Sequence, residues 1–126
     1  MPQENPALKD KFARHLNIEV VLVKEDYAKV KLAVQAHFIN GAGFVQGGVI
    51  FTLADFAFGL AANSQKDSGL AVNVSINFIK AALPTDCLFA EAKLVSRTRK
   101  LGTYQAEVTN QDGAIIARCQ TLAYFK

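Results

Sequence analysis

Residues 47–63 read GGVIFTLADFAFGLAAN, and this stretch decides the fold. Apolar residues occupy nearly every position, and a helix that is apolar on all sides is a buried helix. We therefore predict one long central helix over about residues 47–65, roughly 25 Å in length. A sheet wrapped around such a helix would bury it best.

Six segments outside the central helix have the alternating or β-branched composition of strands. They are residues 18–23, 27–38, 72–78, 88–97, 103–109 and 115–125. Turn signals at Glu25–Asp26 and Asn110–Gly113 predict hairpins, and apolar residues at helical spacing predict a short helix over 6–16. The order predicts an α+β fold in one domain covering residues 1–126. It resembles the hotdog fold, a long central helix wrapped by a curved antiparallel sheet of about five or six strands.

The composition narrows the class of partner. The 14 basic and 11 acidic residues give a net charge of +3, which suits a small anionic ligand as well as a nucleic acid. Without a long basic run, we expect no nucleic-acid partner. Cys87 and Cys119 fit no CxxC pattern, so we expect reduced thiols and no metal site.

Residues 41–62 are long and apolar enough to suggest a membrane span, but they contain Gln46, Asp55 and several glycines. A charged residue at the centre of a span is costly, and the flanking strands are amphipathic. The first ten residues have no apolar segment typical of a signal peptide. We therefore expect a cytoplasmic protein with no membrane partner.

Asp55 carries the only formal charge between Lys31 and Lys66. Burying an ionised carboxylate is unfavourable by several kcal/mol unless the group is paired or hydrogen-bonded. One interpretation is that Asp55 performs chemistry. The alternative is that Asp55 caps a loop or lies at a solvated edge of the helix.

A glycine-rich loop, residues 40–48 with sequence NGAGFVQGG, precedes the helix. It lacks the Lys-Ser/Thr pair of a phosphate-binding loop, and Gln46 stands where a dinucleotide motif needs its third glycine. Gly47 and Gly48 fall at the predicted helix start, where backbone N–H groups have no partner within the helix. These N–H groups would suit an oxyanion hole. The alternative is a tight helix entry that requires glycine for conformational reasons.

Gly47 and Asp55 are eight residues apart, or about 12 Å along the helix axis. A reacting carbon must lie about 3 Å from both the oxyanion donor and the nucleophile or base. One copy of the chain can hardly supply both groups, whereas two antiparallel helices could. We therefore hypothesise an active site at a dimer interface. Small or polar residues at Thr52, Asp55, Gly59 and Asn63 form a stripe that fits either a cleft or a packed interface.

Three short motifs carry a family resemblance: Asn40-Gly41, Gln46-Gly47-Gly48 and Leu53-Ala54-Asp55. Together they resemble the signature of hotdog-fold acyl-CoA thioesterases of the phenylacetate-degradation (PaaI-like) type, which are related to hydroxybenzoyl-CoA thioesterases. The resemblance implies that Asp55 is the catalytic carboxylate, as nucleophile or general base. It also implies that the Gly47 N–H polarises the thioester carbonyl and that Asn40 helps to position the reacting groups.

Gln46 stands where the family usually has histidine. Glutamine keeps an amide donor but cannot titrate. The resemblance also implies a homodimer or a homotetramer built from two dimers. No cofactor is expected, because CoA is part of the substrate.

The expected function is hydrolysis of an acyl-CoA or aryl-CoA thioester to a carboxylic acid and free CoA. The alternative is a hotdog protein that binds acyl-CoA without catalysis. Gly48, Thr52 and Gly59 are candidate substrate-binding residues. The densest basic cluster contains Arg97, Arg99 and Lys100, and it would receive the CoA phosphates or else form an ordinary solvated turn.

Overall fold

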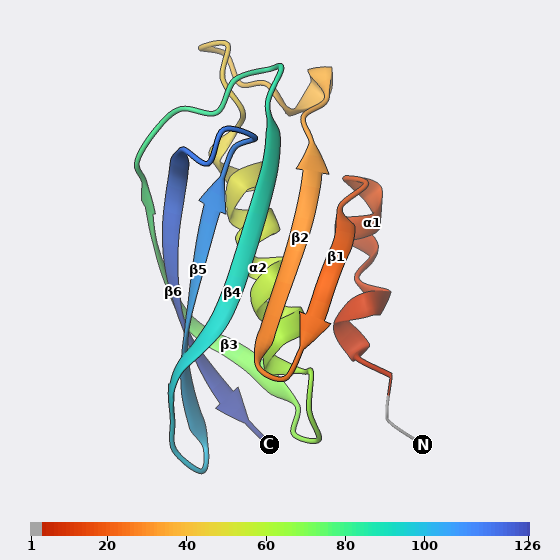
Figure 1. Cartoon of the computed structure of the whole chain (residues 1–126), viewed down its shortest axis with the longest axis vertical. Coiled ribbons are helices and arrows are strands. Elements are labelled where there is room, and N and C mark those ends of the chain that lie inside the picture. Colours follow the sequence, from red (N-terminus) through yellow and green to blue (C-terminus); the bar gives the residue numbers. More distant parts are fainter. Residues whose placement is uncertain (1–3) are drawn as a thin grey trace.

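The structure, a computed structural model, describes residues 4–126. Within that range six antiparallel strands form one sheet that curves around a long helix, α2 (Gly47–Ala62), as Figure 1 shows. The strands are β1 (Glu19–Lys24), β2 (Tyr27–Ala33), β3 (Gly69–Phe78), β4 (Cys87–Arg97), β5 (Leu101–Thr109) and β6 (Ile115–Phe125). Their order is β1-β2-β4-β5-β6-β3, so β1 and β3 are the edges. The predicted helix wrapped by an antiparallel sheet is confirmed.

The core lies between α2 and the inner face of the sheet. The alternate residues of β5, Tyr104, Ala106 and Val108, are all buried on this inner face. Nine residues of α2 are also buried, namely Ile50, Leu53, Ala54, Phe56, Ala57, Phe58, Leu60, Ala61 and Ala62. Each large apolar side chain that folding removes from water contributes roughly 1.5–3 kcal/mol. The rest of the α2 surface stays half-buried or exposed in the single chain.

The central helix ends earlier than predicted, at Ala62 rather than near residue 65. Asn63 ends it by bonding in two directions. Its side-chain amide donates to the Gly59 carbonyl at 2.8 Å, and its side-chain oxygen accepts the Gly69 N–H at 3.1 Å. These bonds satisfy the helix end and attach it to the start of β3. That strand begins at Gly69, three residues before its predicted start.

The predicted single helix over residues 6–16 is wrong. The segment forms a 3₁₀ helix, η1 (Pro6–Lys9), and a short α-helix, α1 (Lys11–His15). Asp10 separates them because its carboxylate accepts the N–H groups of Phe12 and Ala13, each at 3.0 Å, as an N-cap. The Asn5 amide just before η1 donates to the Leu60 carbonyl at 2.8 Å. This bond holds the N-terminal segment against α2.

The strand predicted over residues 27–38 is also too long, since β2 ends at Ala33. A short 3₁₀ helix, η2 (Ala36–Phe38), follows it. Phe38 still reaches the core, where it is 3% exposed. Phe38 therefore belongs to the core although its backbone is a 3₁₀ helix and not the predicted strand.

Two further features bear on the expectations from composition. Cys87, at the start of β4, and Cys119, within β6, are both free thiols. Among residues 4–126, no helix combines the length and hydropathy needed to cross a membrane.

Candidate active site

The first turn of α2 presents a free backbone donor. The Gln46 side-chain oxygen accepts the Gly48 N–H at 2.6 Å, and the Gln46 carbonyl accepts the Val49 N–H at 2.9 Å. Within residues 4–126 the Gly47 N–H has no acceptor. It therefore points from the positive end of the helix with its hydrogen-bonding capacity unused.

Asp55 lies near the middle of α2 and is half-buried. No side chain or backbone group of residues 4–126 donates a hydrogen bond to its carboxylate. Burial raises the pKa of Asp55, and the negative charge of Asp10 raises that pKa further. An unpaired carboxylate of raised pKa is suited to accept a proton or to attack an electrophile.

Gly47 and Asp55 do not meet within one chain. Both belong to the continuous helix α2, so the eight-residue separation holds them about 12 Å apart along its axis. That one copy supplies the oxyanion donor and a second copy supplies the carboxylate therefore stays a prediction.

Asn40 organises the loop in front of the helix. Its side-chain oxygen accepts the N–H groups of Ala42 and Phe44, at 2.9 and 3.1 Å. Because the oxygen is used in this turn, the amide NH₂ is the end of Asn40 left to bind a ligand. The Gln46 N–H donates to the Phe38 carbonyl at 2.8 Å, which fixes the end of the loop beneath α2.

The remaining predicted ligand-binding residues are dispersed. The Thr52 hydroxyl donates to the Gly48 carbonyl at 2.7 Å, within the first two turns of α2. Gly59 faces the N-terminal segment, where a Cβ added to it would lie 3.6 Å from the Ala7 Cβ. The structure therefore separates Gly59 from the Gly47 end of the helix.

The basic cluster lies at the opposite end of α2 from Gly47 (Figure 1). The Arg97 guanidinium pairs with Asp67 at 2.7 Å and lies 3.6 Å from the centre of the Phe125 ring. Arg99 and Lys100 occupy the turn between β4 and β5. Arg97 is thus engaged in packing its own chain, and the Lys100 ammonium lies 5.8 Å from the centre of the Tyr124 ring.

Family comparison matches this architecture and site. The family model for the thioesterase superfamily matches residues 42–117, which include the start of α2 and Asp55. The chain belongs to the thioesterase superfamily. It is a thioester hydrolase with the hotdog fold, of the PaaI-like type, so the fold and the family predicted from the sequence are confirmed.

Individual thioesterases and esterases are similar over most of the chain. A putative esterase of Archaeoglobus fulgidus is 42% identical over 115 residues, 91% of this chain and 75% of that protein. The acyl-coenzyme A thioesterase PaaI of Escherichia coli is 33% identical over 108 residues, 86% of this chain and 77% of its own.

Two solved structures extend the comparison. The structure of Escherichia coli PaaI superposes with a TM-score of 0.91 at 30% identity, over 94% of this chain and 86% of that one. A Streptococcus mutans protein bound to acetyl CoA superposes with a TM-score of 0.84 at 27% identity, over 87% and 89% of the two chains.

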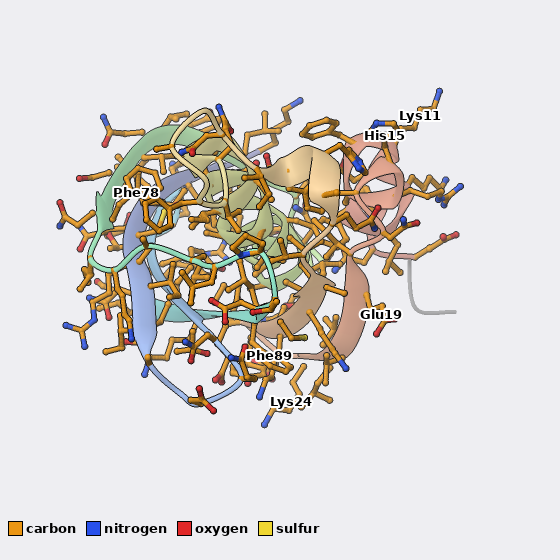
Figure 2. All side chains as sticks on the ribbon, turned by 90° about the horizontal axis from the view of Figure 1, so that it is seen from above. Lys11, His15, Glu19, Lys24, Phe78 and Phe89 are labelled. Atoms are coloured by element: carbon orange, nitrogen blue, oxygen red, sulfur yellow. The ribbon has the colours of Figure 1, made fainter. Side chains whose placement is uncertain are left out.

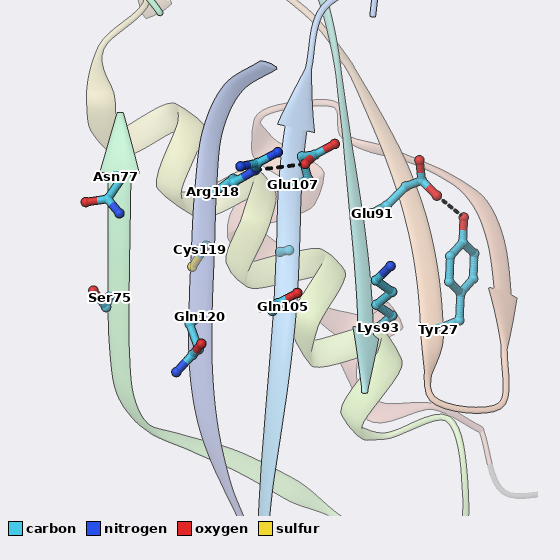
Figure 3. Close-up of a pocket in the computed structure, with 11 residues that line it drawn as sticks. Tyr27, Ser75, Asn77, Glu91, Lys93, Gln105, Glu107, Arg118, Cys119 and Gln120 are labelled. Atoms are coloured by element: carbon cyan, nitrogen blue, oxygen red, sulfur yellow. Dashed lines mark hydrogen bonds and ion pairs between the residues drawn. The ribbon is translucent and has the colours of Figure 1, made fainter. Parts of the chain in front are cut away.

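The thioesterase also has a hollow of about 530 Å³ on the outer face of its sheet, away from α2 (Figure 3). Polar and charged side chains line it, and several of them bond to one another. Arg118 pairs with Glu107 at 3.1 Å, and the Tyr27 hydroxyl donates to Glu91 at 2.5 Å. None of the predicted site residues lines this hollow. The predicted site at α2 is therefore separate from this hollow.

Two residues beside the site were missed from the sequence. The negative charge of Asp10 raises the pKa of Asp55, and the Phe78 ring lies against Gly47. Both contacts join segments far apart along the chain, so no local spacing signals them. Among residues 4–126 no group of His, Cys, Asp and Glu side chains is arranged to hold a metal ion.

Proposed function

We propose that this thioesterase hydrolyses acyl-CoA or aryl-CoA thioesters in active sites shared by two copies of the chain. The observation that carries the proposal is that α2 holds both a free Gly47 N–H and an unpaired Asp55 carboxylate, about 12 Å apart. The name of the Escherichia coli relative and the acetyl CoA in the Streptococcus mutans structure support CoA thioesters as the substrate class.

The edge strand β3 supports a dimer. Its only partner within the described chain is β6, so one row of its backbone groups is unpaired. Leu70, Val72 and Phe78 of β3 and the following Ile79 are 50–58% exposed. Antiparallel pairing of two β3 edges about a two-fold axis would cover these residues and remove the free edge. It would also place the two α2 helices side by side and antiparallel.

In such a dimer the Gly47 N–H of one copy faces Asp55 of the other. As general base, Asp55 removes a proton from water while the water oxygen forms a bond to the thioester carbon. The carbonyl oxygen becomes an oxyanion that the Gly47 N–H stabilises. The C–S bond then breaks, and the leaving thiolate takes the proton from Asp55, giving a carboxylic acid and CoA.

As nucleophile, Asp55 would attack the carbon itself, the C–S bond would break to release the CoA thiolate, and water would then cleave the resulting mixed anhydride. A single turnover in ¹⁸O-labelled water tests for the nucleophilic route. The nucleophilic route puts label into the Asp55 carboxylate when water attacks the anhydride at its aspartyl carbon. The general-base route leaves the protein unlabelled.

Asn40, Gln46, Gly48 and Thr52 would assist at the Gly47 end. The Gly48 N–H donates to the Gln46 side-chain oxygen, and the Thr52 hydroxyl donates to the Gly48 carbonyl in the same turn. We propose that these bonds keep the Gly47 N–H aligned. The amide NH₂ of Asn40 would orient the water or the thioester.

In an antiparallel pair of helices, the C-terminal end of one α2 lies near the N-terminal end of the other. Arg99 and Lys100 of one copy would then approach the site that contains Gly47 of its partner copy. This placement allows two cations to receive the CoA phosphates across the interface.

A cytoplasmic location is also proposed. Cys87 and Cys119 are free thiols, and thiols persist in the reducing cytosol.

The test is thiol release from short, long and aromatic acyl-CoAs, followed by mixing two inactive variants. Asp55→Asn removes the carboxylate. Gly47→Pro removes the N–H at the first helical position, where proline is tolerated, and its ring also presses on the Phe78 side chain. If the sites are shared, co-expression restores activity to about a quarter of the wild-type level, since half of the dimers are mixed and each has one intact site.

No restored activity in purified mixed dimers would overturn the shared site. If the wild-type protein binds acyl-CoA but releases no thiol from any of them, the non-catalytic binding function is correct instead.

A further inference from the structure

The ring of Phe78 lies directly against Gly47. A Cβ atom added to Gly47 would lie 3.3 Å from Cζ and 3.4 Å from Cε1 of Phe78. Phe78 is the last residue of β3, so this contact joins the edge strand to the first turn of α2. In Figure 2 Phe78 lies on the side of the molecule away from α1, with Lys11 and His15 on the far side.

The rest of the ring is open in the single chain, at the edge where a second copy would pair. Phe78 is 54% exposed, although the apolar side chains before it on the same face of β3, Val74 and Ile76, are partly buried against the core. The exposed part of Phe78 therefore lies beside the first turn of α2, the turn in which the Gly47 N–H has no acceptor among residues 4–126. Phe44, 41% exposed, belongs to the loop that leads into α2.

An apolar wall beside an oxyanion donor has two physical effects. It excludes water, so that the donor interacts with the developing charge at a lower local dielectric constant. It also restricts where the carbonyl group can lie, and small displacements at the reacting centre reduce rates strongly. A flexible or polar side chain at this position would supply neither effect.

We propose that Phe78 is a positioning residue that holds the thioester carbonyl against the Gly47 N–H and keeps water away from it. This inference rests on the proposed function and adds to it a residue outside the glycine loop and the central helix. Because Phe78 acts after the CoA moiety is bound, its removal reduces turnover and leaves CoA affinity nearly intact.

The kinetic test compares Phe78→Ala and Phe78→Leu with Phe89→Leu. Phe89 is a matched control because it lies in β4, where the lysines of its neighbour β2 surround it. We expect kcat to fall about tenfold or more in Phe78→Ala, with KM and inhibition by free CoA within about twofold. Phe89→Leu should keep wild-type values. Sedimentation checks that each variant keeps the wild-type oligomeric state.

A second variant tests the contact itself. The methyl group of Gly47→Ala presses on the Phe78 ring but leaves the N–H in place, so kcat should fall. In a Phe78→Leu background the same methyl group has more room, and Gly47→Ala should then reduce kcat by a smaller factor. Independent, multiplicative effects of the two substitutions would contradict a direct contact.

A spectroscopic readout separates this inference from the proposed function. The Asp55→Asn variant should hold a ¹³C-carbonyl acyl-CoA without cleaving it, and the Gly47 N–H should shift the carbonyl stretch to lower frequency. Adding Phe78→Ala should reverse part of this shift. If Phe78→Ala leaves the carbonyl frequency unchanged, Phe78 is only an interface residue. The same holds if Phe78→Ala weakens the dimer while turnover per dimer stays normal. Absence of thiol release from the wild type would instead overturn the proposed function, and the frequency test of Phe78 would still apply.

Discussion

Asp10 and Asp55 carry like charges across the junction of the N-terminal segment and the central helix. Asp10 caps α1, and its charge adds to the effect of burial in raising the pKa of Asp55. The N-terminal segment thereby influences a carboxylate that lies 45 positions later in the chain, and this coupling can be removed without removing the cap.

Asp10→Asn should lower the pKa of Asp55. Asparagine keeps the side-chain oxygen that caps α1, so the fold should be retained, while the repulsion disappears. If ionised Asp55 is the active form, the acidic limb of the pH–rate profile moves to lower pH. Steady-state kinetics between pH 4 and 9 measure this shift.

Two controls support the interpretation. Glu19→Gln removes one exposed negative charge from β1 and should leave the acidic limb in place. Asp10→Ala should move the limb as Asp10→Asn does, but it should also destabilise the protein by about 1 kcal/mol through the lost cap. An unmoved limb in both Asp10 variants would contradict the coupling.

Asp55→Asn should abolish turnover and stabilise the fold at neutral pH. The folded protein holds Asp55 at a pKa above its ordinary value of 3.8, so the folded state binds more protons than the unfolded state in that window. Stability therefore falls as the pH rises from 3.8 through the raised pKa, and it stays reduced above it. The asparagine variant lacks this penalty.

Thermal unfolding at a series of pH values checks the second part of that prediction. The Tm of Asp55→Asn should exceed that of the wild type at pH 7, and the difference should shrink as the pH approaches 4. A variant that is less stable at pH 7 would mean that the ionised carboxylate has a stabilising partner in the assembled protein.

Gln46→His should change turnover modestly, because an imidazole nitrogen can accept the Gly48 N–H in place of the amide oxygen. Gln46→Ala should lose this bond and destabilise the protein by about 1 kcal/mol. Chemical unfolding and kcat measurements test both variants. Equal, small effects of Gln46→His and Asp55→Asn on turnover would contradict the assignment of Asp55.

Arg99→Ala with Lys100→Ala should raise the KM for acyl-CoA several-fold by removing charge that attracts the phosphates. The matched substrate is an acyl thioester of N-acetylcysteamine, which has no nucleotide and should react at the same rate with both proteins. A similar loss with both substrates would instead indicate a general disturbance of the site.

Arg97→Ala should behave differently from the other two cations. Its guanidinium lies over the Phe125 ring and pairs with Asp67, so its loss should reduce stability by about 1–2 kcal/mol. The KM for acyl-CoA should change little. A KM increase as large as that of the Arg99/Lys100 variant would show that Arg97 also binds substrate.

The strands were predictable because alternation is a local consequence of burying one face of a sheet. The inner face of β5 and the hairpin at Asn110–Gly113 follow this rule. In that hairpin the Asn110 side chain accepts the N–H groups of Asp112 and Ala114, and Gly113 has a φ of +79°. Two predictions failed where a polar side chain ended an element, at Asp10 and Asn63, and a third failed at the end of β2, at Ala33.

The candidate site was likewise predictable where the signal is local and unpredictable where it depends on side-chain bonding. The lone charge of Asp55 and the glycines before the helix are visible in the sequence because each contrasts with its immediate neighbours. The separation of Gly47 from Asp55 also follows from helix geometry alone. Nothing in the spacing shows that the Gln46 side chain would bond to the Gly48 N–H and leave the N–H of Gly47 free.

The sequence by itself thus determined the central helix, the strands around it and the two groups suited to thioester chemistry, because these depend on short-range periodicity and composition. Only the tertiary structure decided that Phe78 lies on Gly47, that Asp10 acts on Asp55, and that the basic turn lies at the far end of α2. Such relationships depend on how the curved sheet brings distant segments together. This three-dimensional arrangement produces no periodic pattern in the sequence.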